Sequence, residues 1–283
     1  MECTDNGSTS RWLESLPDLL DACADRWRLQ MGEPLPGGYF AQVFSCTGED
    51  GRALILKLSP PSAAPALEAA ALSFWGGAGA VTLRDWDSSA GALFLDRVFP
   101  GTPLPPGDDE QAAHVAAHVL QILHAARVPN DHPFPTFPQA FASDLERVQL
   151  EAEPSTVGVR LLQQCRDAAT RLWSTTPRAV LLHGDFFDEN LLLAATGYVA
   201  IDPMPRIGDP CSDVGSFASY HPPARSIASR ARLIASLLGY DPARAERWAA
   251  VSAVGEACET WREDSDELQE WMSGPEAERL LAL

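Results

Sequence analysis

His183-Gly-Asp-Phe-Phe-Asp-Glu-Asn190 is the stretch of this 283-residue sequence from which its architecture is best predicted. The apolar run Val180–Leu182 precedes it and predicts a short buried strand, so Asp185 lies in a loop that leaves a strand. A second apolar run, Tyr198–Ile201, follows the loop and ends at Asp202. Two strands that lie side by side would bring the polar groups of the loop close to this carboxylate.

The spacing of these polar groups predicts phosphoryl transfer. Asn190 follows Asp185 by five residues, the spacing between the base and the metal-binding asparagine of a kinase catalytic loop. A carboxylate can accept the proton of an attacking hydroxyl, and amide and carboxylate oxygens suit Mg²⁺. We therefore interpret Asp185 as the catalytic base and Asn190 and Asp202 as metal ligands. Each residue alone is more often a turn former or helix cap, and His183 is expected to be structural.

Lys57 is the only lysine among the 21 basic residues of the chain. Side chains alternate across a strand, so the leucines of the predicted strand 52–58 share a core face and Lys57 points the opposite way. Glu68 is the only acidic residue between Lys57 and Asp85, and it lies on the predicted helix 65–75. A strand lysine paired with a helix glutamate is typical of kinase-like phosphate binding. The alternative is a solvated edge lysine and a solvent-facing glutamate.

A glycine turn, Gly37-Gly-Tyr-Phe-Ala-Gln-Val-Phe44, precedes Lys57 by one hairpin. It matches neither G-x-x-x-x-G-K-[ST] nor the full G-x-G-x-x-G pattern, and two adjacent glycines usually just make a turn. Its position before the lysine strand nevertheless favours a nucleotide contact. We expect Gly38 and Phe40 to contribute to that contact.

The order of the predicted elements indicates an α+β chain with two lobes. Strands 37–44, 52–58, 81–86 and 92–98, with helix 65–75, precede a segment rich in proline and glycine, Phe99–Gly107. The other helices are predicted at 15–29, 111–126, 141–151, 157–173, 226–238, 243–261 and 265–281. We expect a small β-rich lobe over residues 1–98, a larger and mainly helical lobe over residues 99–283, and a cleft between them.

The composition limits the partners and the compartment. The net charge of −18 disfavours nucleic acid and anionic membranes and favours cationic ligands. No apolar run reaches the ~18 residues that a membrane span needs, and the N-terminus lacks a signal segment. Six scattered cysteines without a C-x-x-C pair favour free thiols over a zinc site. We expect a cytoplasmic monomer.

These motifs resemble those of the aminoglycoside phosphotransferase family, a branch of the protein-kinase-like fold. The family's H-G-D-x-x-x-x-N is present at 183–190, its I-D-x metal segment at 201–203, and its G-D-P-x-x-D at 208–213. Three further segments are similar to the streptomycin 6-kinase and hydroxyurea phosphotransferase subgroup: 68–75, 79–81 and 91–101. The resemblance covers residues 35 to 220.

The resemblance implies a bilobal kinase that uses ATP, or GTP, together with Mg²⁺. Asp185 would be the base, and Lys57, paired with Glu68, would contact the phosphates. The backbone from Asp96 to Val98 would meet the adenine edge. Asn190 and Asp202 would hold Mg²⁺. No activation loop is implied, so the activity is expected to be constitutive.

Two residues depart from the protein-kinase pattern. Gly184 replaces the arginine before the base, and Pro203 replaces the phenylalanine after Asp202. Both changes are normal in the antibiotic-kinase branch. Asp209 and Asp213 are expected to cap the next helix and to brace the catalytic loop.

The acceptor is expected to be a cationic antibiotic. Residues 256–278 contain nine acidic residues and one basic residue, although most of these carboxylates are expected on a solvated helix face. The candidate substrate contacts are Asp188, Glu189, Glu256, Glu259 and Glu263. The resemblance admits an aminoglycoside such as streptomycin or a cyclic peptide such as viomycin or capreomycin. The alternatives are a metabolic kinase of choline, homoserine or a sugar amine, and a nucleotide-binding module without catalysis.

Overall fold

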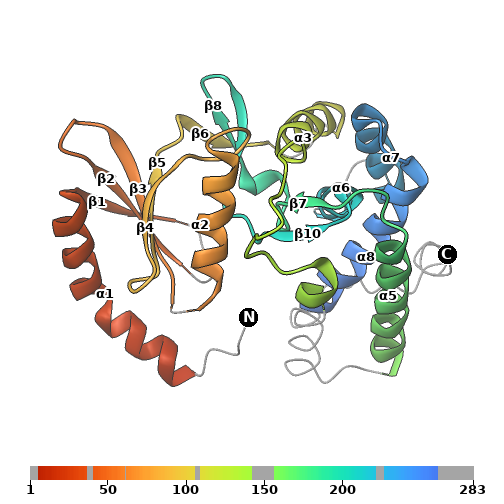
Figure 1. Cartoon of the computed structure of the whole chain (residues 1–283), viewed down its shortest axis with the longest axis horizontal. Helices are drawn as coiled ribbons and strands as arrows, with labels where there is room; N and C mark the ends of the chain where they lie inside the picture. The colour runs from red at the N-terminus through yellow and green to blue at the C-terminus, as the bar shows by residue number, and fades with distance from the viewer. Residues whose placement is uncertain are drawn as a thin grey trace.

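The structure, a computed structural model, describes residues 6–36, 41–60, 62–105, 109–141, 156–220 and 226–260. An antiparallel five-stranded sheet comes first, and a largely helical part follows it (Figure 1). The predicted α+β class is therefore confirmed. The predicted helix 265–281 and nearly all of the predicted helix 141–151 lie outside the described residues. No helix of the described part is long and apolar enough to cross a membrane.

The five-stranded sheet has the strand order β1-β2-β3-β5-β4. Its strands are β1 (Gln30–Leu35), β2 (Gln42–Thr47), β3 (Ala53–Leu58), β4 (Leu83–Asp87) and β5 (Ala92–Asp96). The sequence predicted four of them and missed β1. Pro34 lies inside β1, and a proline is tolerated there because β1 is an edge strand.

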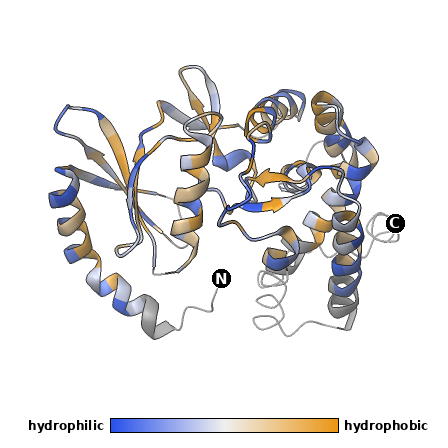
Figure 2. Ribbon diagram, viewed as in Figure 1, coloured by the Kyte–Doolittle hydropathy of each residue, from blue (hydrophilic) through white to orange (hydrophobic). Residues whose placement is uncertain are grey.

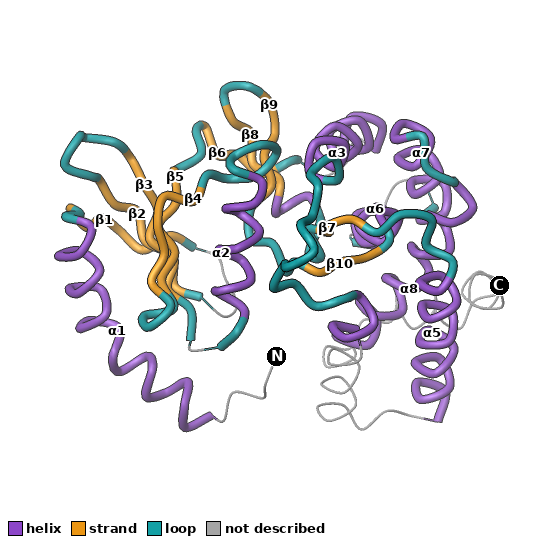
Figure 3. The backbone as a smooth tube through the Cα atoms, in the orientation of Figure 1, coloured by secondary structure: helices purple, strands orange, loops and turns teal. Residues whose placement is uncertain are grey.

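One helix covers each face of this sheet (Figure 3). Helix α1 (Asn6–Trp27) packs on the face that carries the leucines of β3, which are almost fully buried. Helix α2 (Ala64–Trp75) lies on the other face, where Ile55 and Lys57 alternate with those leucines. The predicted division of β3 into an apolar core face and a lysine face is therefore correct.

The chain after β5 forms several helices and two small sheets. Its helices are α3 (Asp109–Leu123), α5 (Thr156–Ser174), α6 (Pro210–Ser219), α7 (Ile227–Leu238) and α8 (Pro242–Thr260). Strands β7 (Val180–Leu182) and β10 (Arg206–Gly208) pair with each other, and β6 (Pro100–Pro103), β8 (Leu191–Ala194) and β9 (Gly197–Ala200) form the second sheet. Figure 2 shows apolar residues on the β7–β10 pair at the centre of this part.

A continuous apolar core joins α2 to the helical part. Leu72 and Trp75 of α2 belong to the same buried cluster as Leu120 of α3. The backbone adds a direct connection next to this core. Val81 N donates to Ala200 O at 2.9 Å, and Ala200 N donates to Gly79 O at 2.9 Å. The loop after α2 is thereby hydrogen-bonded to β9, the strand that leads to Asp202.

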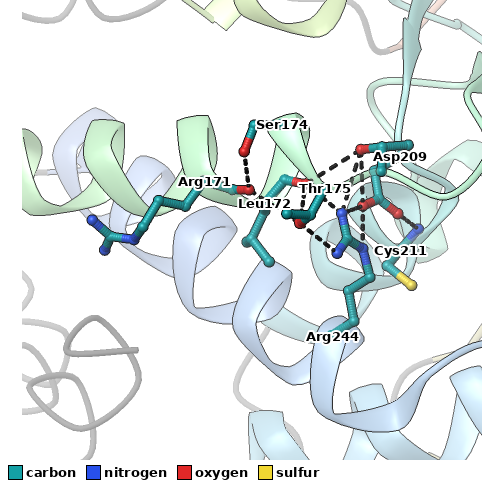
Figure 4. Close-up of polar contacts among 8 residues, drawn as sticks. Arg171, Leu172, Ser174, Thr175, Asp209, Cys211 and Arg244 are labelled. Carbon is teal, nitrogen blue, oxygen red and sulfur yellow. Dashed lines mark hydrogen bonds and ion pairs between the residues drawn. The ribbon is translucent and has the colours of Figure 1, made fainter.

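A polar network holds α5, α6 and α8 together (Figure 4). The Nε atom of Arg244 on α8 donates to Asp209 Oδ2 at 2.5 Å. Its Nη atoms donate to Thr175 Oγ1, at 3.1 Å, and to the carbonyl oxygen of Leu172. Asp209 also accepts from Cys211 N at 3.0 Å and so caps α6, as predicted.

Candidate active site

The loop from His183 to Phe187 leaves β7 and enters a single 3₁₀ turn, Asp188–Asn190. Asn190 Nδ2 donates to the backbone oxygen of Asp185 at 2.9 Å and to its Oδ2 atom at 3.1 Å. The structure therefore brings the predicted base and the predicted asparagine ligand into contact. Asp185 is only partly buried, so a substrate can reach this residue.

Asp213 of α6 holds this loop in place by hydrogen bonds. Its carboxylate accepts from His183 N at 2.9 Å, from Gly184 N at 3.0 Å and from His124 Nε2 at 3.0 Å. Burial alone would raise the pKa of Asp213, but the hydrogen bond and charge of His124 lower it below the usual carboxyl range. An ionised Asp213 thus holds two consecutive amides immediately before Asp185, and the predicted bracing role is correct.

The ring of His183 is buried, as its expected structural role requires. Its Nε2 atom lies 3.0 Å from the carbonyl oxygen of Ile201, to which a neutral imidazole can donate. Burial lowers the pKa of His183 and keeps the ring neutral. The ring also stacks beside Trp75 of α2, with centroids 6.3 Å apart. His183 therefore connects the catalytic loop with both β9 and α2.

Lys57 lies between two carboxylates. Its ammonium donates to Glu68 Oε1 at 2.9 Å and to Oε2 at 2.7 Å, and it also contacts Asp202 Oδ1. These contacts account for its three donors. Burial would lower the Lys57 pKa, but the charges of Glu68 and Asp202 raise it above its ordinary value. The predicted Lys57–Glu68 ion pair is therefore present, and the lysine is charged.

Asp202 lies on the open side of this cluster. Its side chain is 46% exposed, whereas the Glu68 side chain is 8% exposed. Its φ of 58° is in the left-handed region, which non-glycine residues seldom occupy and which concentrates at functional sites. Pro203 follows it and disfavours the right-handed helical conformation at this position.

The backbone of residues 96–98 follows β5 and lies at the start of the predicted linker. The Asp96 side chain is bound by Arg84, whose Nε and Nη2 atoms each donate to a carboxylate oxygen at 2.6 Å. Asp96 N donates to Thr82 O at 2.9 Å. The contact of the backbone from Asp96 to Val98 with a base edge stays a prediction.

The candidate substrate contacts are described only in part. Glu189 is exposed beside the base, and Asp188 is buried. Glu256 and Glu259 lie on α8, but their side chains are not among those described. Glu263 lies outside the described residues, as do the predicted nucleotide contacts Gly38 and Phe40.

The donors at Asn190 and Asp202 fit a hard divalent cation. Asn190 uses its amide nitrogen to hold Asp185, which leaves its amide oxygen to act as a ligand. Asp202 supplies a half-exposed carboxylate. Within the described ranges no group of three His, Cys, Asp or Glu side chains is arranged around a metal position.

Comparison with protein families agrees with this geometry. The family of aminoglycoside/hydroxyurea antibiotic resistance kinases matches residues 26–265. The chain belongs to this family. The protein is therefore a phosphotransferase, and the expected resemblance to the streptomycin 6-kinase and hydroxyurea phosphotransferase subgroup is confirmed.

Two relatives carry names that state an activity. A hydroxyurea phosphotransferase of Kitasatospora aureofaciens is 29% identical over 248 residues, which are 84% of this chain and 71% of that protein. A streptomycin 6-kinase of Streptomyces griseus is 29% identical over 212 residues, which are 72% of this chain and 66% of that protein.

Solved structures show the same fold at low sequence identity. A choline/ethanolamine kinase family protein from Mesorhizobium loti superposes with a TM-score of 0.67 at 16% identity, covering 93% of this chain and 98% of that chain. A thermostable mutant of aminoglycoside phosphotransferase APH(4)-Ia, in a ternary complex with AMP-PNP and hygromycin B, gives 0.66 at 15% identity, with 93% and 97% covered. The kinase-like fold predicted from the sequence is therefore confirmed.

Proposed function

We propose that this kinase transfers the γ-phosphate of ATP to a hydroxyl of a cationic antibiotic and so confers resistance. The observation that carries the proposal is the contact of Lys57 with both Glu68 and Asp202, together with the Asp185–Asn190 contact. In this proposal the buried cation, the base and the two oxygen ligands would act together where the sheet meets the helical part. GTP is a second possible donor.

Lys57 would bind the phosphates of the nucleotide. Its contacts with the buried Glu68 hold the ammonium in place. A phosphate oxygen would replace the half-exposed Asp202 as the other partner of the ammonium. The backbone of residues 96–98 would meet the base. In this proposal residues 1–98 form the nucleotide-binding lobe, with Gly38 and Phe40 as further contacts, and residues 99–283 form the catalytic and acceptor-binding lobe.

Asp185 would accept or orient the proton of the acceptor hydroxyl. The acceptor oxygen forms a bond to the γ-phosphorus, the bond from that phosphorus to the bridging oxygen breaks, and ADP leaves with the electron pair. Asn190 holds the Asp185 carboxylate and backbone in place for this role. Asp213 fixes the loop before it through the amides of His183 and Gly184.

Asn190 and Asp202 would hold Mg²⁺ by their oxygen atoms. The bound ion would neutralise negative charge on the phosphates during transfer. Because Asp202 also contacts Lys57, the same carboxylate connects the metal position with the phosphate-binding lysine.

The acceptor would be an aminoglycoside such as streptomycin, or a cationic cyclic peptide such as viomycin or capreomycin. Glu189 is an exposed residue four positions after the base, and Glu256, Glu259 and Glu263 are proposed as further acceptor contacts. A second candidate is a metabolic kinase of a small amine, which is favoured by the fold match to the choline/ethanolamine kinase family protein.

Turnover assays with a panel of acceptors test the proposal. ATP consumption is measured with streptomycin, other aminoglycosides, viomycin, capreomycin, hydroxyurea and choline. We expect a cationic antibiotic to give the highest kcat/KM. Asp185→Asn should reduce kcat by at least about 100-fold, because the proton acceptor is lost, while ATP binding is retained. Asp131→Asn, the same change at an exposed position, is the matched control.

Turnover of choline alone would favour the metabolic kinase, and no turnover with any antibiotic would refute the resistance function. Activity of Asp185→Asn within tenfold of the unmodified protein would show that another group is the base.

A further inference from the structure

Helix α6 runs along the catalytic loop and contacts it at successive positions. Asp213 and Phe217, together with Tyr220 just after the helix, are spaced four and three residues apart and so lie on one helical face. Asp213 binds the amides at the start of the loop. Phe217 packs against Phe186, with ring centroids 5.6 Å apart. The same face then reaches the end of the loop through Tyr220.

The last of these contacts is a stacked aromatic pair. The rings of Phe187 and Tyr220 have centroids 4.0 Å apart and planes 18° apart. The preceding pair, Phe186 and Phe217, is fully buried and belongs to the core, whereas Phe187 and Tyr220 are only half-buried. The catalytic loop therefore presents an accessible aromatic surface two residues after Asp185.

A buried arginine fixes the position of Tyr220. Arg230 of α7 donates from Nη1 to Tyr220 O at 3.3 Å, and its guanidinium lies over the Phe217 ring, 4.6 Å from the centroid. Tyr220 also ends α6 as its C-cap residue. The backbone of Tyr220 is thus held from two sides, so its ring is held in place against Phe187.

The aromatic pair and the segment before Asp202 contact different residues of the loop. His183 and Asn190 are hydrogen-bonded to Ile201, the residue before Asp202. Phe187 instead stacks on Tyr220 at the end of α6. In phosphoryl transfer the attacking and leaving oxygens are roughly in line, so the acceptor approaches Asp185 from the side opposite the nucleotide.

We infer that Phe187 and Tyr220 form a binding surface for the acceptor, against which a cationic, hydroxyl-bearing ligand packs while its hydroxyl reaches Asp185. The inference rests on the proposed function and names the residues that would select its substrate. Aromatic faces attract ammonium and guanidinium groups, and the exposed Glu189 adds a carboxylate at the end of the same loop.

The test separates acceptor binding from loop positioning. In Phe187→Leu and Tyr220→Leu the packing volume is largely kept and the aromatic face is lost. We expect the KM of the best cationic acceptor to rise about 5- to 30-fold and the KM of ATP to stay within twofold. Phe94→Leu, which removes one ring of the stacked pair Trp27–Phe94 outside the site, is the matched control and should leave both KM values unchanged. Calorimetric titration of the acceptor without nucleotide should show the same loss of affinity. If a leucine variant fails to fold, as judged by thermal unfolding, the methionine variant at the same position carries the test.

A fall in kcat with unchanged acceptor KM would overturn the inference, because it would show that the stack only positions the loop. An equal rise in the KM of ATP would also overturn it. The unmodified protein is assayed first. If it turns over no cationic acceptor, the proposed function is refuted and this inference with it.

Discussion

Gly184 separates the catalytic loop from the segment that follows Asp202. Its φ is 80°, and an added Cβ atom would overlap the backbone oxygen of Met204. The two segments are close because Met204 N donates to His183 O at 2.9 Å. Protein kinases have an arginine at this position, but here no side chain fits between the two backbones, so glycine is required.

Gly184→Ala should therefore destabilise the protein and reduce its activity. We expect the free energy of unfolding to fall by more than about 3 kcal/mol, because the left-handed conformation and the overlap act together. A displaced Asp185 should also reduce kcat by about 100-fold. Gly239→Ala is the matched control, since Gly239 has a φ of 71° and no atom within 4 Å of an added Cβ.

Denaturant unfolding and steady-state kinetics measure both effects. The control should lose about 1–2 kcal/mol and keep its activity. Equal losses of stability in the two variants would show that the Met204 contact does not restrict the loop.

Individual site residues could be predicted where chemistry and spacing in the sequence coincide. The structure brings Lys57 into contact with Glu68 and Asp202, and Asn190 into contact with Asp185. The supporting residues could not be found in this way. His124 and Tyr220 are far from the motif in sequence, and their contacts depend on how α3 and α6 pack. The helix before His124 contains two further histidines, His114 and His118, so the sequence did not single out His124.

At the scale of elements, Arg244 determines how three helices meet. Its guanidinium binds the cap of α6 and the C-terminal end of α5, and its side chain is 13% exposed beside an Asp209 side chain that is 1% exposed. The ion pair therefore lies in a region of low dielectric. Loss of one partner would leave the other charge buried without compensation.

Arg244→Met should lower the free energy of unfolding by about 3–5 kcal/mol. Arg232→Met provides the matched control within the same helical part. Arg232 pairs with Glu246 at 2.5 Å, but its side chain is 55% exposed, so its removal should cost at most about 1 kcal/mol. Thermal and denaturant unfolding of both variants measure the difference. Similar losses would mean that the buried network does not hold the helices together.

The elements themselves were predictable where their periodicity is strong. The sequence predicted α2, β3, β7 and α7 close to their observed bounds. It missed β1, β6 and β10. Proline lies within β1 and β6, and each of these is an edge strand, where proline does not break the hydrogen-bond ladder. β10 has only three residues and forms because β7 offers it a partner. Such strands depend on their neighbours and not on their own sequence.

At the scale of the whole molecule, one buried histidine should make stability depend on pH. The unfolded chain takes up a proton on His183 near pH 6.5, whereas burial lowers the pKa of this ring in the folded protein. Below pH 6.5 the unfolded state binds more protons, so the free energy of unfolding falls as the pH falls. Asp213 acts in the same direction at lower pH, because the stability it contributes is lost as the pH falls through its lowered pKa.

We therefore expect His183 to lower the unfolding free energy by up to about 1.4 kcal/mol per pH unit between pH 6.5 and 5. Glu68 opposes this effect, because burial raises its pKa to about 7. Denaturant unfolding over this range measures the slope, and the His183 contribution is the difference in slope between the unmodified protein and His183→Gln. His183→Gln should be less stable at pH 7 but should lose less stability, or gain more, as the pH falls. His114→Gln, at an exposed position, is the control and should keep the slope of the unmodified protein. An unchanged slope in His183→Gln would show that another group is responsible.

The hydrogen bonds between Ala200 and the loop after α2 limit which sequence changes this segment can accept during evolution. They use only main-chain atoms, at Gly79, Val81 and Ala200. Gly79 is itself restricted, because its φ is 74° and an added Cβ would lie 3.1 Å from Ile122 Cγ2. The insertion or deletion of one residue would shift the register that sets Asp202 against Lys57. In this segment selection has to preserve the length of the loop and the glycine at position 79.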